Sequence, residues 1–255
     1  MPRGVGLNWL YDEARLQNRL LTPQSLAVQM RSRLHFWWSA DQLNVDASGL
    51  VSGAIDLTGN ENNGVQSTAA NRLSYFASDR MFGGRPSFGS TTSTGARHLA
   101  APSALAYRWQ IFSCYYKDGV DNTFDSATFF TTGAATFGSP RIMGAVGAAT
   151  LITNDVFAST LSRGGGVQSN TVLPMPATVC AATPGALTVA YSLQVGGNSF
   201  TLDRVLVGAF RHFVSSSATL TNNEISLIEG VIAWDDGTPL VASHRFANRP
   251  PLIGD

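Results

Sequence analysis

Charged residues are scarce in this sequence of 255 residues. Asp, Glu, Lys and Arg make up 13% of the chain, roughly half the usual share, and Lys117 is the one lysine. A helical bundle needs many charged residues on its exposed faces, so this composition argues against one. Hydrophobic residues reach 44%, which excludes wholesale disorder. With abundant Gly, Ser, Thr and Asn in addition, the composition favours an all-β fold with many turns.

Long apolar runs are also missing. Residues 1–10 hold no apolar core of the kind that a signal peptide needs, and no 18-residue apolar stretch occurs. We therefore expect synthesis in a cytoplasm and no membrane segment. Cys114 and Cys180 stand in apolar, strand-like runs, which favours buried free thiols; a disulfide or a reactive thiol stays open. Without clustered histidines, two cysteines cannot form a zinc site.

The first 34 residues differ from the rest of the chain. They hold five arginines and two acidic residues, a net charge of +3, which leaves −3 on the remainder. Helical spacing of apolar residues and the pair Thr22-Pro23, a typical helix start, predict two short helices or a helix and an extended arm. We expect residues 1–34 to dock onto the body of the protein or onto a partner subunit. The predicted docking residues are Trp9, Tyr11, Arg15, Arg19, Arg31 and Arg33.

The remaining residues, 35–255, are expected to form one domain. The mildly basic segment 1–34 on this mildly acidic domain is too weakly charged to predict nucleic-acid binding. Short apolar runs separated by Gly- and Asn-rich turns predict strands over residues 35–38, 108–116, 127–132, 141–146, 177–182 and 187–195. The run Gly196-Gly197-Asn198 predicts a hairpin. Near the end, Thr221 and Glu224 form a capping box that predicts a helix, which Gly237 ends.

Several segments resemble the concanavalin A-like lectin/glucanase (laminin-G-like) domains. Trp38-Ser39-Ala40-Asp41, followed by Leu43, resembles their W-x-D-A-S-x-L opening, and residues 56–63 resemble their D-x-S-G-N-x-N turn. Residues 83–88 are similar to G-G-R-P-x-x-x-F, residues 228–234 to the closing helix I-E-G-Y-L-A-x-K-W, and residues 244–251 to H-P-Y-K-N-x-P-P. Asp235-Asp236 departs from the pattern, because the family has a basic residue there.

The resemblance implies a two-sheet antiparallel jelly roll with a C-terminal helix and a partly helical N-terminal arm. Copies of this domain without a signal peptide often occur in bacteriophage virion proteins. The resemblance therefore implies a non-enzymatic virion surface protein, either a capsid decoration or a small tail accessory. Its expected partners are other virion proteins, bound through residues 1–34, and further copies of itself, with a trimer favoured.

Carbohydrate recognition is the alternative function, and glycoside hydrolysis is a third. The resemblance implies an E-x-D-x-E strand for the glucanases of this fold, and no such triplet occurs here, so we predict no catalytic residues. No G-x-S-x-G motif places a nucleophilic serine. A sugar site needs an exposed aromatic side chain, which the sequence alone does not select. The candidates are Tyr75, Phe76, Phe82, Tyr107 and Phe124.

Calcium is the one cofactor for which the sequence offers candidate ligands. Asp118, Asp121, Asn122 and Asp125 crowd a single predicted turn, and oxygen ligands of this kind suit Ca²⁺. The spacing differs from that of an EF-hand, and a polar hairpin turn is the competing interpretation. The group in residues 56–62 is similar, but Asn-Gly turn chemistry explains it without a metal.

Overall fold

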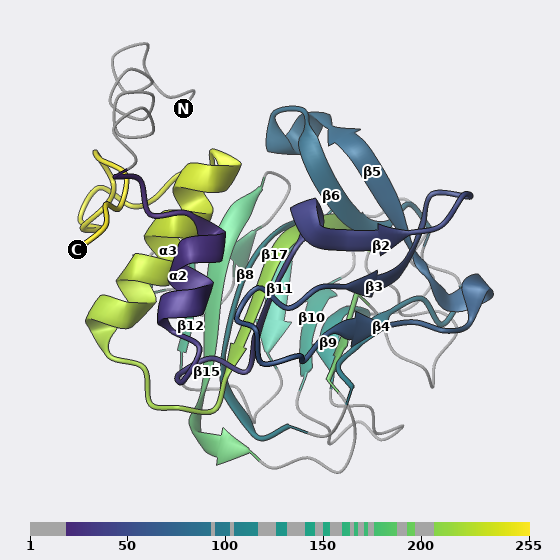
Figure 1. Cartoon of the computed structure of the whole chain (residues 1–255), viewed down its shortest axis with the longest axis horizontal. Helices are drawn as coiled ribbons and strands as arrows, with labels where there is room; N and C mark the ends of the chain where they lie inside the picture. Colours follow the sequence, from purple (N-terminus) through teal and green to yellow (C-terminus); the bar gives the residue numbers. More distant parts are fainter. Residues whose placement is uncertain are drawn as a thin grey trace.

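The computed structural model is an antiparallel β fold with helices packed against one side (Figure 1). It describes residues 19–92, 95–102, 105–116, 126–131, 141–145, 150–153, 160–163, 166–167, 171–172, 176–187, 193–196 and 207–255. The all-β prediction is confirmed at this level. Within these residues, the two α-helices are α2 (Pro23–Gln29) and α3 (Asn222–Asp236).

The longest strands form the centre of the β-structure. In this part, β17 (Gly208–Ser216) pairs along one edge with β8 (Tyr107–Tyr116), which in turn pairs with β15 (Ala177–Leu187). The other edge of β17 pairs with β1 (Phe36–Ser39) and with β6 (Arg85–Ser90). Every one of these pairings is antiparallel.

Shorter elements extend the β-structure on both sides. Around β6 lie β5 (Leu73–Asp79), β3 (Leu50–Ala54), β2 (Leu43–Val45), β4 (Gly64–Val65) and β7 (Leu99–Ala100). The others are β9 (Ser126–Thr131), β10 (Arg141–Ala145), β11 (Thr150–Thr153), β12 (Thr160–Arg163), β13 (Gly166–Val167), β14 (Thr171–Val172) and β16 (Gln194–Val195). Three 3₁₀ turns are described: η1 (Ala40–Gln42), η2 (Ala69–Asn71) and η3 (Arg80–Phe82).

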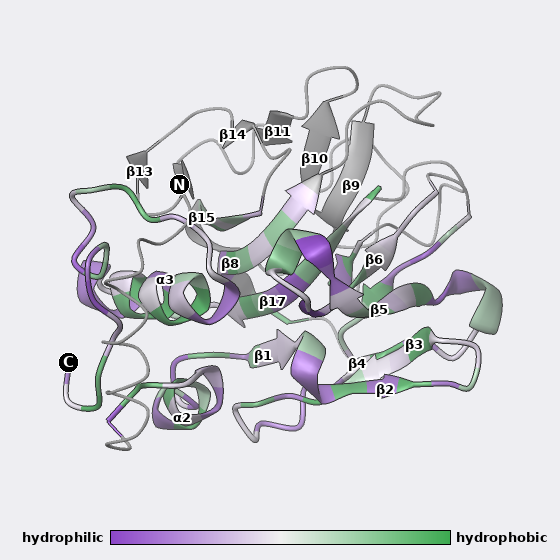
Figure 2. Ribbon diagram, turned by 90° about the horizontal axis from the view of Figure 1, so that it is seen from above, coloured by the Kyte–Doolittle hydropathy of each residue, from purple (hydrophilic) through white to green (hydrophobic). Residues whose placement is uncertain are grey.

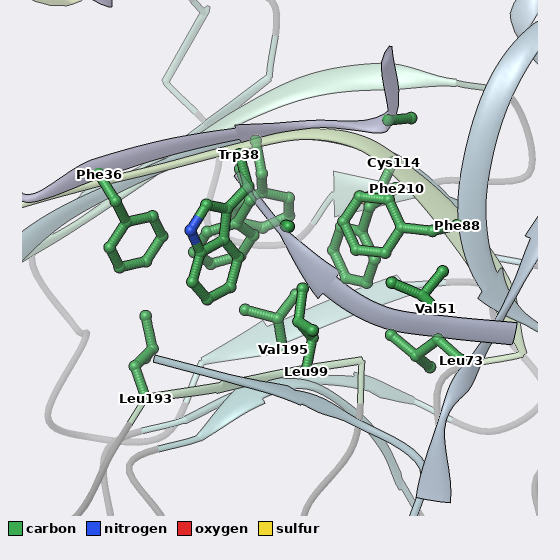
Figure 3. Close-up of a cluster of buried hydrophobic side chains, with 14 of the residues drawn as sticks. Phe36, Trp38, Val51, Leu73, Phe88, Leu99, Cys114, Leu193, Val195 and Phe210 are labelled. Carbon is green, nitrogen blue, oxygen red and sulfur yellow. The ribbon is translucent and has the colours of Figure 1, made fainter. Parts of the chain in front are cut away.

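An inner core of aromatic and aliphatic side chains lies between the strands (Figure 3). Phe36 and Trp38 of β1 stack with their ring centroids 4.1 Å apart, and Phe112 of β8 stacks on Phe213 of β17 at 5.4 Å. Val195 of β16 closes the core from the other side. These rings are fully buried, so the inner core removes a large apolar area from water.

A second, outer core lies between the sheet and the helices (Figure 2). Because alternate residues of a strand face opposite sides, Trp37 points to this outer core while its neighbours Phe36 and Trp38 point inward. The same alternation separates the two cysteines: Cys114 lies in the inner core and Cys180 in the outer one. Neither forms a disulfide bond and both are buried, which confirms the buried-thiol interpretation.

Both helices begin where the sequence predicts. Thr22 caps α2 and Thr221 caps α3, each in a capping box, and Gly237 ends α3 in a left-handed conformation at φ 75°. Leu26 of α2 lies in the outer core together with Ile228 and Ile232 of α3. The described part of the N-terminal segment therefore packs against the body of its own chain.

The predicted strands over residues 35–38, 108–116, 127–132 and 141–146 correspond to β1, β8, β9 and β10, with ends that differ by at most one residue. The strand predicted over 177–182 is longer, because β15 continues to Leu187. Of the strand predicted over 187–195, the structure describes β16, and the second strand of the predicted hairpin lies outside the described residues. No helix in the described parts of the chain is long and apolar enough to cross a membrane.

Candidate functional site

An irregularity in β17 creates the most unusual feature of the molecule. Phe210 and Phe213 both face the inner core, although residues three apart in a regular strand face opposite sides. The register shifts between them: Phe210 pairs with Cys114 and His212 pairs with Ser113, which leaves Arg211 as an extra residue. This β-bulge directs both Arg211 and His212 towards the end of α3.

The guanidinium of Arg211 contacts η1, α3 and β6. Arg211 is 1% exposed, so these contacts are buried. Its Nη2 lies 2.6 Å from Asp41 Oδ2 on η1 and 2.8 Å from Asp235 Oδ2 on α3. Its Nη1 donates to the carbonyl of Pro86 on β6, and its Nε lies 2.7 Å from Asp236 Oδ1. Burial opposes the charge, but Asp236 and Asp235 outweigh it and raise the pKa of Arg211 above its ordinary value.

His212 lies beside the same carboxylates and is fully buried. Its Nε2 is 3.0 Å from Asp235 Oδ2 and 3.3 Å from Asp236 Oδ1. Burial lowers its pKa, but the charge of Asp236 and the hydrogen bonds to both carboxylates prevail and raise the pKa to about 9. One contact opposes a second proton: the indole N–H of Trp37, which can only donate, lies 3.3 Å from Nδ1.

Two carboxylates at the C-terminal end of a helix are unfavourable by themselves, because the helix dipole places partial negative charge there. Asp235 and Asp236 are the last two residues of α3, and its last turn holds no basic residue. Although burial raises the pKa of Asp235, the hydrogen bond with His212 and the nearby arginines hold it well below its ordinary value. The cations on β17 and β6 therefore hold this end of the helix against the sheet.

The cluster reaches solvent at one edge, which we name the polar rim: Asp41, Arg85 and Asp235. The side chain of Asp41 is 47% exposed and that of Arg85 38%, whereas that of Asp235 is 17% exposed. Arg85 Nη1 lies 2.7 Å from Asp235 Oδ1. Buried Arg211 thus holds the carboxylates of Asp41 and Asp235 in place, and the partly exposed Arg85 lies beside Asp235.

The cluster also contains the group of possible metal ligands found in the described residues. One ligand atom from each of His212, Asp235 and Asp236 lies within 4.8 Å of the others. Arg211, however, approaches both carboxylates at hydrogen-bonding distance and already supplies the positive charge that a cation would bring. These residues therefore do not fit a metal ion while Arg211 is in place.

The turn over residues 56–63 is held by its own hydrogen bonds. Asp56 Oδ1 accepts from the backbone N–H of Trp37 and of Thr58, and its Oδ2 accepts from the N–H of Asn62. The amide of Asn60 donates to the carbonyl of Leu34. Turn chemistry accounts for these residues, as the sequence interpretation without a metal requires.

The other predicted site residues are only partly described. The predicted calcium ligands Asp118, Asp121, Asn122 and Asp125 lie outside the described residues, as do Trp9, Tyr11 and Arg15. Arg19 and Arg31 are exposed. Arg33 forms an ion pair within the chain, with its Nε 2.9 Å from Glu224 Oε1. Docking through the N-terminal segment therefore stays a prediction.

Sequence reasoning missed the polar rim, although its signals were present. Asp41 belongs to the Trp38–Asp41 motif, Arg85 to the Gly-Gly-Arg-Pro motif, and Asp235 follows the closing-helix motif. Three separately noted segments thus meet at one place. The acidic pair that departs from the family pattern is the part that binds Arg211.

No protein-family model matches the chain, and a sequence search of curated proteins found no match. Among solved structures, a Trypanosoma rangeli sialidase in complex with 2,3-difluoro-KDN matches at 10% identity and TM-score 0.47, over 80% of this chain and 33% of that one. An arabinofuranosidase complexed with arabinofuranosyl-alpha-1,2-xylobiose matches at 10% identity and TM-score 0.45, over 80% and 59%. A GH54 α-L-arabinofuranosidase mutant matches at 10% identity and TM-score 0.44, over 85% and 66%. The chain spans about a third of the sialidase.

These comparisons correct four predictions. The matching structures are glycoside hydrolases and not phage proteins, so the recognition of a phage-type concanavalin A-like domain was wrong. The predicted virion surface function with its capsid-decoration role and the predicted non-enzymatic character are likewise contradicted, since the matching proteins are a sialidase and arabinofuranosidases. The sequence motifs were too short to separate one β fold from another. At these TM-scores, the likeness in turn carries no argument for a shared activity.

Proposed function

We propose that the domain binds carbohydrate and that the polar rim is its binding site. The observation that carries this proposal is the fixed pair of carboxylates above buried Arg211. Asp41 and Asp235 present hydrogen-bond acceptors to solvent, and Arg85 presents donors. Sugar hydroxyl groups both donate and accept, so a rim with both kinds of group is suited to them.

The rim is also preorganised, which favours binding. The backbone N–H of Asp41 donates to the side chain of Ser39, and Asp41 itself binds Arg211 through both carboxylate oxygens. Asp235 is held from two sides, by Arg211 and by Arg85. Groups that are already oriented lose little conformational entropy when a ligand binds, and this raises affinity.

Hydrolysis of a glycosidic bond is a second candidate, and one distance favours it. Asp41 and Asp235 each bring an oxygen to the same Nη2 atom, at 2.6 and 2.8 Å, so these oxygens lie no farther apart than the two distances combined. Retaining glycosidases place their two carboxyl groups about 5–5.5 Å apart, which is close to this upper limit. The reaction also needs one protonated carboxyl group, whereas Arg211 favours the ionised form of both. The geometry therefore supports binding better than hydrolysis.

A glycan array followed by calorimetry tests the proposed function. We expect the wild-type protein to bind a subset of glycans, and Asp41→Asn to weaken that binding at least about tenfold, because the loss of one charged hydrogen-bond partner is worth about 1.5–3 kcal/mol. Asp46→Asn is the control, since Asp46 forms a similar partly exposed ion pair, with Arg72. Absence of any bound glycan would contradict the proposal. Release of nitrophenol from 4-nitrophenyl glycosides by wild type, but not by Asp41→Asn, would favour hydrolysis.

We further propose that the β-structure is a two-sheet jelly roll. The inner core supports this arrangement, because β1, β8 and β17 contribute side chains from one side and β3, β7 and β16 from the other. An experimental structure of the whole chain would test it through the strand order.

A further inference from the structure

We propose that Phe76 is the stacking surface of the polar rim and that the sugar it receives is uncharged. This inference rests on the proposed carbohydrate function and deepens it. A sugar ring has an apolar face of C–H groups as well as hydroxyl groups at its edge. A carbohydrate site therefore gains affinity from an aromatic ring beside its polar groups.

The strand register selects Phe76 from the aromatic candidates whose side chains the structure describes, which are Tyr75, Phe76 and Phe82. On β5 and β6, Tyr75 pairs with Phe88 and Phe76 pairs with Ser87. Phe88 lies in the inner core and Tyr75 packs against it, so Phe76 and Ser87 face the opposite, outer side. Phe82 is 1% exposed and cannot receive a ligand, whereas Phe76 is partly exposed.

The outer side of β6 is also the side of the polar rim. Arg85 precedes Ser87 by two residues on the same strand, so both side chains share one face, and Arg85 reaches Asp235 from it. Phe76 pairs with Ser87 and Asp79 pairs with Arg85, so β5 carries one extra residue between these two pairs. In a regular ladder, diagonal neighbours such as Phe76 and Arg85 lie about 7–8 Å apart, which is similar to the size of a sugar ring, and the bulge changes this spacing locally. One ring can therefore cover Phe76 while its hydroxyl groups contact Arg85 and the carboxylates.

The charges of the site argue for an uncharged sugar. The carboxylate of an acidic sugar such as a sialic or uronic acid is bound most strongly by a charged donor, typically a bidentate arginine. Here Arg85 already binds Asp235, and Arg211 already binds Asp41, Asp235 and Asp236. A ligand carboxylate would have to displace one of these partners and would be repelled by the others. Hydroxyl groups meet no such penalty.

The test measures binding of neutral cello-, xylo- and chito-oligosaccharides and of sialyllactose to the full chain by calorimetry, at low and at high salt. We expect neutral ligands to bind with little dependence on salt. Phe76→Ala is expected to weaken this binding about tenfold, and Phe76→Trp to retain it, because tryptophan keeps an aromatic face. Val65→Ala is the matched control, since Val65 is an exposed apolar residue on β4, at 50% exposure. Thermal unfolding of each variant verifies that it is folded.

The outcomes separate this inference from the proposed function. If no glycan binds, the proposed function fails and this inference fails with it. If glycans bind and Asp41→Asn weakens them, but Phe76→Ala and Phe76→Trp both bind like wild type, the carbohydrate function stands and the role of Phe76 is overturned. Preference for sialyllactose, with binding that falls steeply with salt, would overturn the uncharged ligand.

Discussion

The two ends of α3 are held to the protein in different ways. At the first end, Arg33 pairs with Glu224, and the two side chains are 39% and 25% exposed. At the second end, Arg211 and His212 pair with Asp235 and Asp236 in a site that is almost closed to solvent. Water screens the first set of charges and screens the second very little. We therefore expect changes at the second end to have much the larger effects.

The largest effect should follow from Arg211→Met. Methionine retains much of the apolar length of the side chain but leaves two buried carboxylates without their main cation. Removal of one partner from a buried ion pair typically costs about 3–5 kcal/mol, and we expect the free energy of unfolding to fall by about this amount. Denaturant unfolding measures it. The double variant with Asp235→Asn should recover part of the loss; a single variant as stable as wild type would contradict the role of Arg211.

A smaller effect is expected from raising the pH. The pKa of His212 is raised to about 9, above the ordinary value of 6.5 that applies in the unfolded chain. The protonated ring therefore contributes stability that is complete below pH 6.5 and is lost as the pH rises through 9. We expect the free energy of unfolding to fall by at least about 1.4 kcal/mol across this window, the equivalent of one pKa unit.

The hydrogen bond from the Trp37 indole N–H to His212 Nδ1 would lead to the opposite result, in which stability does not change over this pH range. If this hydrogen bond keeps Nδ1 unprotonated, His212 is neutral throughout and stability stays level between pH 6.5 and 9. The ¹⁵N chemical shifts of the His212 ring distinguish the two states directly. His98 is an internal reference, because burial lowers its pKa and its Nδ1 lies 2.7 Å from the carbonyl of Ala96.

The smallest effects should occur at the first end of α3. Thr221→Ala removes the N-cap side chain and is expected to lower the free energy of unfolding by about 1 kcal/mol. Arg33→Ala removes an exposed partner of Glu224 and should change it less than Thr221→Ala does. Urea unfolding of both variants beside Arg211→Met compares the two ends directly. An Arg33→Ala loss as large as that of Arg211→Met would refute the difference between them.

The sequence predicted those parts of the structure that depend on neighbouring residues. The capping box of Thr221 and Glu224 and the stop at Gly237 lie within one helix, so their pattern can be read locally. The strand that became β8 alternates poorly, but its aromatic residues together with Ile111 and Cys114 were enough to predict it. Local physical chemistry decides such elements almost alone.

The polar rim could not be predicted in this way, because its members meet only through the fold. Arg85 and Asp235 are 150 residues apart, and Arg211 and Asp41 are 170 apart. Their meeting depends on the bulge in β17, which arises from pairing with β8 and leaves no clear pattern in the residues around Arg211. The choice of Phe76 over Tyr75 depended in the same way on the register between β5 and β6.

The extra residue in β17 makes the charged side of this strand independent of the packing of the inner core. Without Arg211, the run Phe210-His212-Phe213 would alternate in and out as an ordinary strand does, and both rings would still reach the inner core. A strand without Arg211 would therefore keep the same side chains in the inner core. Such a strand would lose the guanidinium that contacts Asp41, Asp235 and Asp236, and with it the charge that holds these carboxylates together.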